Sequence, residues 1–144
     1  MARRRRLLVD TNVLIDYCDR QRPCHDDAVR LVHAAARDGG VELVVLVSSL
    51  KDLYYILCRR LGDERMARRA TEVAATSVFV VVDLLASYAP RALSSDEPDF
   101  EDGLVRVAAE ELGVEAIVSR DERAFVHARM PRVDAHQARE RLVA

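Results

Sequence analysis

The fold is decided by residues 7–15, which read LLVDTNVLI. Three apolar residues are too few for a helix, and they end at the carboxylate of Asp10 before Thr11 and Asn12 lead into a second apolar run. This order is typical of a short buried strand that passes directly into a helix. It puts Asp10 at the carboxyl end of the strand, although Asp, Thr and Asn are also the residues that commonly cap helices.

Short apolar runs of the same kind alternate with longer amphipathic stretches along the rest of the chain. This alternation predicts an α/β fold, a three-layer Rossmann-like arrangement in which helices flank a central parallel sheet of four to five strands. No linker, repeat or low-complexity tract divides the sequence, so we expect a single domain over residues 1–144. The expected strands are 7–9, 43–47, 78–82 and 116–118, with 132–133 as a weak edge strand, and the expected helices are 26–37, 50–61, 64–75 and 100–112.

The overall charge does not mark the chain as a nucleic-acid-binding protein, because 24 acidic residues nearly balance 22 basic ones. All but one of the bases are arginines, which suits bidentate contacts to phosphate but is explained equally well by coding bias. The cysteines and histidines lack the spacing of zinc sites. No apolar stretch is long enough to cross a membrane, so we expect a cytoplasmic protein with no membrane partner.

Two further acids stand close to the ends of predicted strands. Asp121 follows the strand expected at 116–118, with the hydroxyl of Ser119 between them. Asp52 lies in the first turns of the helix that follows 43–47, where an acid also simply complements the helix dipole. Because the carboxyl ends of parallel strands meet at one edge of a sheet, we expect these acids to lie near each other.

The helix expected at 100–112 begins with a group of acids. Asp99 and Asp102 are three residues apart and share a face, whereas Glu101 is expected to point elsewhere. A helix cap at Asp99 explains this pair without any function, so a functional and a structural interpretation both stay open here. Acids delivered to one edge by several separate elements nevertheless favour a site over a set of caps.

Carboxylates gathered in one place repel one another, which raises their pKa values unless a cation compensates the charge. Oxygen ligands suit Mg²⁺ or Mn²⁺. Such an ion can lower the pKa of a bound water and shield the charge that develops on phosphorus. The chemistry indicated is phosphodiester hydrolysis, with Asp10, Asp52, Asp102 and Asp121 as catalytic acids and with Asp10, Asp99, Asp102 and Asp121 as metal ligands.

Residues 10–14, which read DTNVL, resemble the opening signature of PIN domains. Residues 48–55 resemble the segment that carries the second acid of that family, 99–104 its third-acid helix, and 117–125 its closing strand and polar turn. The resemblance covers nearly the whole chain. It implies a Mg²⁺- or Mn²⁺-dependent endoribonuclease and, as in many bacterial members, a toxin of the VapC type that an antitoxin protein counteracts.

The nuclease hypothesis assigns roles beyond the acids. Thr11, Asn12 and Ser119 would donate hydrogen bonds that orient carboxylates or water. RNA would be attracted by individual arginines rather than by net charge, and the helices over 50–75 carry more apolar residues than one buried face needs, which predicts a homodimer or a bound antitoxin. The arginines expected to contact RNA are Arg59, Arg60 and Arg120, within a wider group that includes Arg3, Arg4, Arg5, Arg6, Arg65, Arg68 and Arg69.

Two departures from the family pattern keep other functions open. Ala124 stands where the closing turn often has an acid, and Asp52 replaces a commoner glutamate. Both favour an alternative in which the chain is a catalytically weak or inactive PIN-like module that binds RNA or a protein partner. A third hypothesis is a phosphatase of the haloacid-dehalogenase kind, but that family needs an acid where Asn12 stands.

Overall fold

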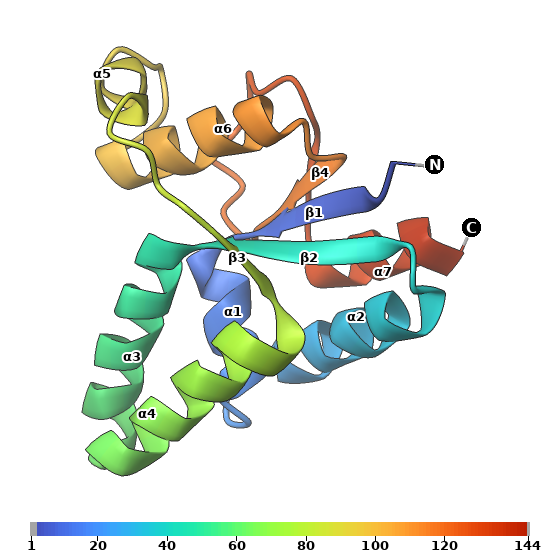
Figure 1. The fold of residues 1–144 in the computed structure, drawn as a ribbon, viewed down its shortest axis with the longest axis vertical. Helices are drawn as coiled ribbons and strands as arrows, with labels where there is room; N and C mark the ends of the chain where they lie inside the picture. The colour runs from blue at the N-terminus through green and yellow to red at the C-terminus, as the bar shows by residue number, and fades with distance from the viewer. Residues whose placement is uncertain (1–2, 144) are drawn as a thin grey trace.

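Within residues 3–143, the range that the structure describes, five strands form a parallel sheet (Figure 1). They are β1 (Arg5–Val9), β2 (Val41–Leu46), β3 (Val80–Val82), β4 (Ala116–Val118) and β5 (Arg132–Val133). The structure is a computed structural model, and its strand order is β3-β2-β1-β4-β5, with every neighbouring pair parallel. The predicted α/β fold with a central parallel sheet is confirmed.

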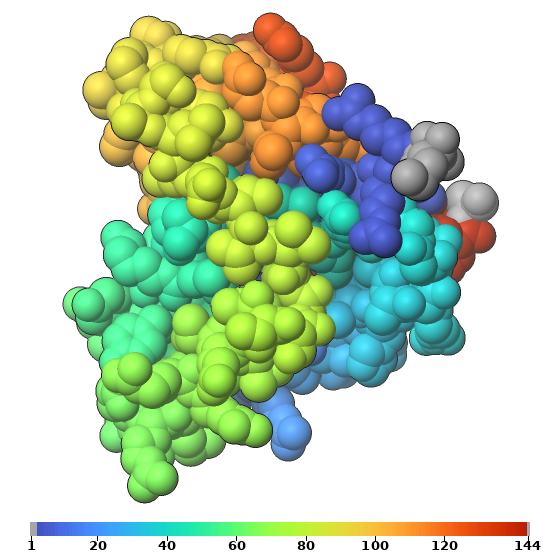
Figure 2. Space-filling model, viewed as in Figure 1, coloured from blue at the N-terminus to red at the C-terminus, as the bar shows by residue number. Residues whose placement is uncertain are grey.

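Helices cover both faces of this sheet (Figure 1). They are α1 (Thr11–Cys18), α2 (His25–Asp38), α3 (Val47–Leu61), α4 (Glu64–Val73), α5 (Tyr88–Leu93), α6 (Phe100–Leu112) and α7 (Ala135–Val143). Side chains of β1 alternate between the faces, so Leu7 and Val9 join the core under α1, α2 and α7, whereas Leu8 joins the core under α5 and α6. Helices α3 and α4 form a hairpin that projects from the body of the molecule (Figures 1 and 2).

None of the helices within 3–143 combines the length and apolarity needed to cross a membrane.

Helix α3 begins at Val47, three residues earlier than predicted. The strand before it ends at Leu46, which is paired with Val82 at the end of β3. Beyond that pair β2 has no neighbour that could satisfy its backbone, so the chain turns into a helix. As a result Asp52 lies in the second turn of α3, and the first turn contains no acid. The alternative that Asp52 complements the helix dipole therefore loses its basis, because that effect is confined to the first turn.

A π-helical segment, η1 (Ala74–Val78), joins α4 to β3, and the prediction of a strand that starts at residue 78 is wrong. Its wider turn is closed by a hydrogen bond from the Phe79 N–H to the Ala74 carbonyl oxygen at 3.0 Å. The extra residue rotates Phe79 inward, where its ring meets the edge of Tyr17 at a centroid separation of 5.7 Å. Burial of this aromatic side chain outweighs the regular helical pattern of the local sequence.

Helices α5 and α7 were not predicted, because each depends on contacts outside its own segment. Helix α5 has only six residues and packs against α6. Helix α7 packs on α2, and a reciprocal cap between Asp134 and Gln137 starts it, with distances of 2.9 and 2.8 Å. Their short or weakly amphipathic sequences give little local evidence of a helix.

The contact between α5 and α6 requires a glycine at position 103. A Cβ atom added to Gly103 would lie 2.7 Å from the carbonyl oxygen of Ala92, which is backbone and has little freedom to move. We therefore expect Gly103→Ala to lower the free energy of unfolding by about 1–3 kcal/mol. Denaturant unfolding measures the change, and Gly40→Ala is the matched control because its added Cβ meets nothing within 4 Å. Equal stability of the two variants would contradict the predicted clash.

Candidate active site

The carboxyl ends of β1 and β4 are neighbours, and this edge holds the centre of the candidate site. Val9 is in register with Val118, and the Asp10 N–H donates to the Val118 carbonyl oxygen at 2.9 Å. The chain leaves β1 towards β2 on one side, while β4 lies on the other side, so this is the point at which the strand order reverses. Ligands of open α/β sheets bind at such a point.

Asp10 is held by hydrogen bonds from two directions. One carboxylate oxygen accepts the Thr11 N–H at 2.9 Å, which caps α1, and the other accepts the Ser119 hydroxyl at 2.8 Å across the two strands. Asn12 adds a longer contact of 3.4 Å from its side-chain amide. The carboxylate is 6% exposed. Burial raises the pKa of Asp10, and the hydrogen bond from Ser119 opposes that rise.

The Ser119 hydroxyl is the hub that joins Asp10 to Asp121. Besides donating to Asp10, its oxygen accepts the Asp121 N–H and the side-chain amide of Asn12, each at 3.1 Å. Ser119 itself is fully buried. The two strand-end acids that the sequence singled out are thus linked through one side chain.

Helix α6 brings Asp102 towards the same group of acids. Burial raises the pKa of Asp102 to about 7, and the next largest causes are the charges of Asp99, Asp10 and Asp121. Asp99 caps the helix, since its carboxylate accepts the Asp102 N–H at 2.8 Å. The helix cap expected at Asp99 is present, and the charge of Asp99 also acts on the neighbouring acids. The structure brings Asp10, Asp99, Asp102 and Asp121 into one electrostatic cluster.

Glu101 faces the site, contrary to the expectation that it points elsewhere. With Asp52 and Arg59 it lines a cavity of about 270 Å³ that Thr11 also reaches. Burial raises the pKa of Glu101, and the charges of Asp52 and Asp10 raise it further. Sequence spacing placed Glu101 on another face of α6, but the site wraps around the start of that helix and takes acids from more than one face. Asp52 also lies 3.5 Å from the ammonium of Lys51.

Ala124, which stands where the family often has an acid, packs in the apolar core. It is 1% exposed and lies in the apolar core under α6 together with Phe125, whose φ of 67° is unusual for a bulky residue. The Phe125 N–H donates to the carboxylate of Glu97 at 2.8 Å. That carboxylate is almost fully buried and bonds Arg106 at 3.3 Å. An acid from the preceding loop thus supports the closing turn and adds negative charge near Asp102.

The predicted RNA-contacting arginines lie in different environments. Arg59 lines the cavity beside Asp52, and within residues 3–143 it has no ion pair. Arg60 lies 2.6 Å from Asp19, and Arg120 is paired with Asp16 at the same distance.

Three arginines of the wider group lie at the opposite, amino edge of the sheet. They are Arg4, Arg5 and Arg6, and they pair with Glu42 or Glu115.

Two residues that the sequence interpretation did not select also belong to this framework. Ser49, which is buried at the start of α3, accepts the Thr11 hydroxyl at 2.9 Å and so ties α1 to α3. Asp16 is a buried acid on α1, four residues after Asn12. Its position inside an otherwise apolar run could have indicated a buried ion pair, because a buried carboxylate needs charged or hydrogen-bonding partners.

The donors at this edge fit a hydrated Mg²⁺ or Mn²⁺ better than a tightly coordinated ion. No three His, Cys, Asp or Glu side chains within residues 3–143 are gathered as a ready-made metal site. Mg²⁺ keeps several of its waters and binds through one or two carboxylates. Burial and, after it, the charges of Asp99, Asp10 and Asp121 raise the pKa of Asp102 to about 7, and a cation beside these acids would lower it again.

Comparison with known proteins decides the family. The sequence model described as PIN domain matches residues 6–123. The chain belongs to the PIN domain family. That match spans every acid of the cluster, from Asp10 to Asp121, and ends within the closing turn. No curated protein matches this PIN domain in sequence.

Three solved structures share the fold of this PIN domain. The toxin VapC20 of Mycobacterium tuberculosis, described as cleaving the sarcin–ricin loop, is 20% identical with a TM-score of 0.67 over 81% of this chain and 90% of its own. VapBC2 of Rickettsia felis, bound to a DNA fragment from its promoter, is 10% identical with a TM-score of 0.68, over 90% and 98% of the chains. FitAcB of Neisseria gonorrhoeae is 16% identical with a TM-score of 0.65, over 90% and 97%.

The raised pKa of Asp102 predicts how stability depends on pH in the metal-free PIN domain. Asp102 keeps its proton up to about pH 7 when folded but releases it near its usual value of 3.8 when unfolded. The folded state binds more protons between these values, so the free energy of unfolding should fall as pH rises through this window. Thermal unfolding at about pH 5 and pH 8 measures the loss, which should shrink in Asp102→Asn. An equal loss in both proteins would show that Asp102 is not the group responsible.

Proposed function

We propose that this PIN domain is a metal-dependent endoribonuclease that hydrolyses RNA phosphodiester bonds and acts as the toxin of a toxin–antitoxin pair. The observation that carries the proposal is that the Ser119 hydroxyl donates to the Asp10 carboxylate and accepts the backbone N–H of Asp121, beside an Asp102 whose pKa is raised to about 7. A structural cap has no need for three acids from separate elements at one sheet edge. Membership of the PIN family supports the same conclusion.

Asp10, Asp102 and Asp121 would hold Mg²⁺ or Mn²⁺, in part through the waters that such an ion keeps, because the three carboxylates are not gathered as a ready-made site. Asp99 would add negative charge at the start of α6. The bound ion would offset the repulsion among these carboxylates and supply Lewis-acid activation of water and phosphate. Thr11 and Ser119 keep Asp10 in one orientation through the hydrogen bonds that its two oxygens accept. Asn12 holds the Ser119 hydroxyl in place from α1.

Asp52 and Glu101 together would take the role that a single glutamate often has in the family. Asp52 is one methylene shorter, and Glu101 from α6 adds a carboxylate beside the same cavity. Arg59 and the exposed ring of Tyr55 line that cavity as well, which gives a cation and a stacking surface next to the acids. Of the predicted RNA contacts, we retain Arg59 as the strongest, because its guanidinium has no ion pair within the described chain.

The cleavage test uses purified protein, short RNAs and Mg²⁺ or Mn²⁺. Asp10→Asn should lower the rate by about 100-fold or more, because it removes a charge that the ion needs. Asp26→Asn, an exposed acid on α2, is the matched control and should leave the rate unchanged. Cleavage that persists in EDTA, or that is equal in Asp10→Asn and the parent protein, would contradict the proposal.

The alternative of an inactive RNA-binding module is separated by calorimetry. The nuclease should bind Mn²⁺ alone, and Asp10→Asn should weaken that binding. RNA affinity without Mn²⁺ binding at millimolar concentration would favour the inactive module. The match to the PIN family leaves the phosphatase hypothesis without support.

A groove between α1, α2 and α4 supports the antitoxin part of the proposal. It measures about 550 Å³ and is lined by apolar and basic side chains. An amphipathic helix with apolar side chains flanked by acids would complement it. The likeness in fold to VapBC2 and FitAcB supports a protein partner. The apolar lining includes Tyr17, Val29, Met66, Ala70 and Val73, and the basic lining includes Arg20, His25, His33 and Arg69.

Co-expression with the product of the neighbouring gene, if that gene encodes a small protein, tests the partner. A partner that occupies the groove should co-purify with the parent protein and be lost with Ala70→Glu, which places a charge among the apolar lining residues. Val143→Glu, on the exposed end of α7, is the control. Co-purification that Ala70→Glu does not weaken would place the partner elsewhere. The homodimer also remains a proposal, and light scattering at high concentration tests it.

A further inference from the structure

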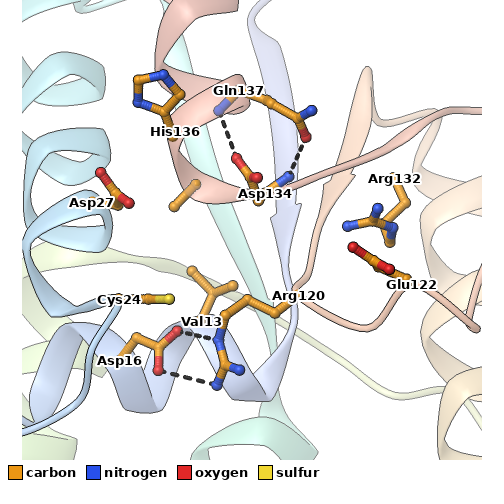
Figure 3. A pocket seen from close by; sticks show the side chains of 11 residues that line it. Val13, Asp16, Cys24, Asp27, Arg120, Glu122, Arg132, Asp134, His136 and Gln137 are labelled. Atoms are coloured by element: carbon orange, nitrogen blue, oxygen red, sulfur yellow. Dashed lines mark hydrogen bonds and ion pairs between the residues drawn. The ribbon is translucent and has the colours of Figure 1, made fainter.

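Asp16 is a carboxylate buried on α1 next to the candidate active site, with a side chain that is 2% exposed. It is held by two arginines from different parts of the chain. Arg22, from the loop between α1 and α2, donates through Nε at 3.0 Å. Arg120, from the turn after β4, donates through Nε at 2.6 Å and through Nη2 at 3.2 Å, as Figure 3 shows. A buried carboxylate is costly unless it is paired and hydrogen-bonded, so these contacts are essential for burying Asp16.

Arg120 is attached to α1 at two points. Its guanidinium reaches Asp16, and its backbone N–H donates to the side-chain oxygen of Asn12 at 3.1 Å. Asn12 and Asp16 are four residues apart and therefore lie one above the other on the same face of the helix. Residue 120 is thus fixed both through its backbone and through the far end of its side chain. It has little freedom to move relative to α1.

The residues on either side of Arg120 are those that form the candidate site. Ser119 donates to Asp10 at 2.8 Å, and the Asp121 N–H donates to the Ser119 hydroxyl at 3.1 Å. Asp10 stands at the start of the same helix that carries Asp16. Any movement of Arg120 away from α1 would therefore change the separation of Asp10 and Asp121.

We propose that the ion pair between Asp16 and Arg120 positions the Ser119–Asp121 turn against Asp10, and that Arg120 serves the site in this way rather than by contacting RNA. The proposal rests on the nuclease function proposed above. Asp16 and Arg120 are positioning residues, since neither belongs to the acid cluster itself. The pair sets the distance between two carboxylates that would share one ion.

The surroundings of Arg120 argue against a phosphate contact. Its Nε and Nη2 atoms are already bonded to a carboxylate that water hardly reaches. It also lines a cavity of about 370 Å³ (Figure 3) whose wall carries four acids and one other arginine. An RNA phosphate there would compete with Asp16 for the guanidinium and approach further negative charge. The charged residues of that wall are Asp16, Asp27, Arg120, Glu122, Arg132 and Asp134.

The side chain at position 120 has to be arginine for this role. A planar guanidinium can donate two bonds to one carboxylate and fix the orientation of both groups. A lysine keeps the charge but donates from a single point, so it would hold Asp16 without fixing the turn to the same degree. Arg120→Lys should therefore fall between the parent protein and Arg120→Ala in every measurement below.

Arg22 provides a matched control, because it pairs with the same carboxylate and lies outside the Ser119–Asp121 turn. Arg120→Ala and Arg22→Ala each remove one cation from Asp16, and both should lower the melting temperature. Only Arg120→Ala should weaken binding of Mn²⁺, by about 10- to 100-fold in calorimetry with the metal alone. It should lower kcat for RNA cleavage at fixed Mn²⁺ while KM for RNA and its salt dependence stay as in the parent protein.

Hydrogen exchange tests the positioning without metal or catalysis. In the metal-free protein, Arg120→Ala should speed exchange of the amide protons of Arg120 and Asp121, which are held by Asn12 and Ser119. Arg22→Ala should leave these two amides protected. Hydrogen exchange also separates the two proposals. A parent protein that neither binds Mn²⁺ nor cleaves RNA would overturn the nuclease function. The exchange rates would still decide whether Arg120 holds the turn.

Three outcomes would overturn the proposal. Equal loss of Mn²⁺ affinity in Arg22→Ala and Arg120→Ala would mean that the pair contributes stability alone. Unchanged exchange in Arg120→Ala would mean that the backbone contacts hold the turn without the ion pair. A raised KM for RNA with a weaker salt dependence and intact Mn²⁺ affinity would make Arg120 an RNA contact.

Discussion

Repulsion between carboxylates at the carboxyl edge of the sheet is the constraint to which the surrounding structure responds. Asp10, Asp102 and Asp121 come from three elements and act on one another strongly enough to contribute to the raised pKa of Asp102. The fold offsets part of this repulsion with hydrogen bonds, above all from the buried Ser119 hydroxyl to Asp10. The rest of the repulsion adds to burial in raising the pKa of Asp102, and the divalent cation proposed for this site would offset it.

The framework behind the acids is built from hydrogen bonds and ion pairs that converge on α1. Thr11 ties this helix to Ser49 on α3, Asn12 ties it to Ser119, and Asp16 ties it to Arg120. These contacts run along α1 from its first turn to its second, so the helix aligns the strand ends on both sides of β1. One departure from the family pattern is the shorter side chain of Asp52, and Glu101 adds a second carboxylate to the cavity that Asp52 lines.

Sequence reasoning went furthest where the information was local. The strands around Asp10 and Ser119, the helix that starts near Asp99 and the parallel sheet followed from short apolar runs that end in polar residues. It was less successful where contacts with other elements determine the bounds of a helix or strand. The start of α3 was set by the end of β3, the π-helical turn by the burial of Phe79, and α7 by packing on α2. None of these partners is adjacent in the chain.

The sequence by itself determined that acids would stand at strand ends and at the start of a helix, because strand and helix boundaries are properties of short segments. Only the tertiary structure decided which acids interact electrostatically, that Glu101 faces Asp52, and that Arg120 is paired with a buried Asp16. The physical reason is that charge interactions depend on separation in space and on burial. Neither quantity can be calculated from the order of residues until the helices have been packed against the sheet.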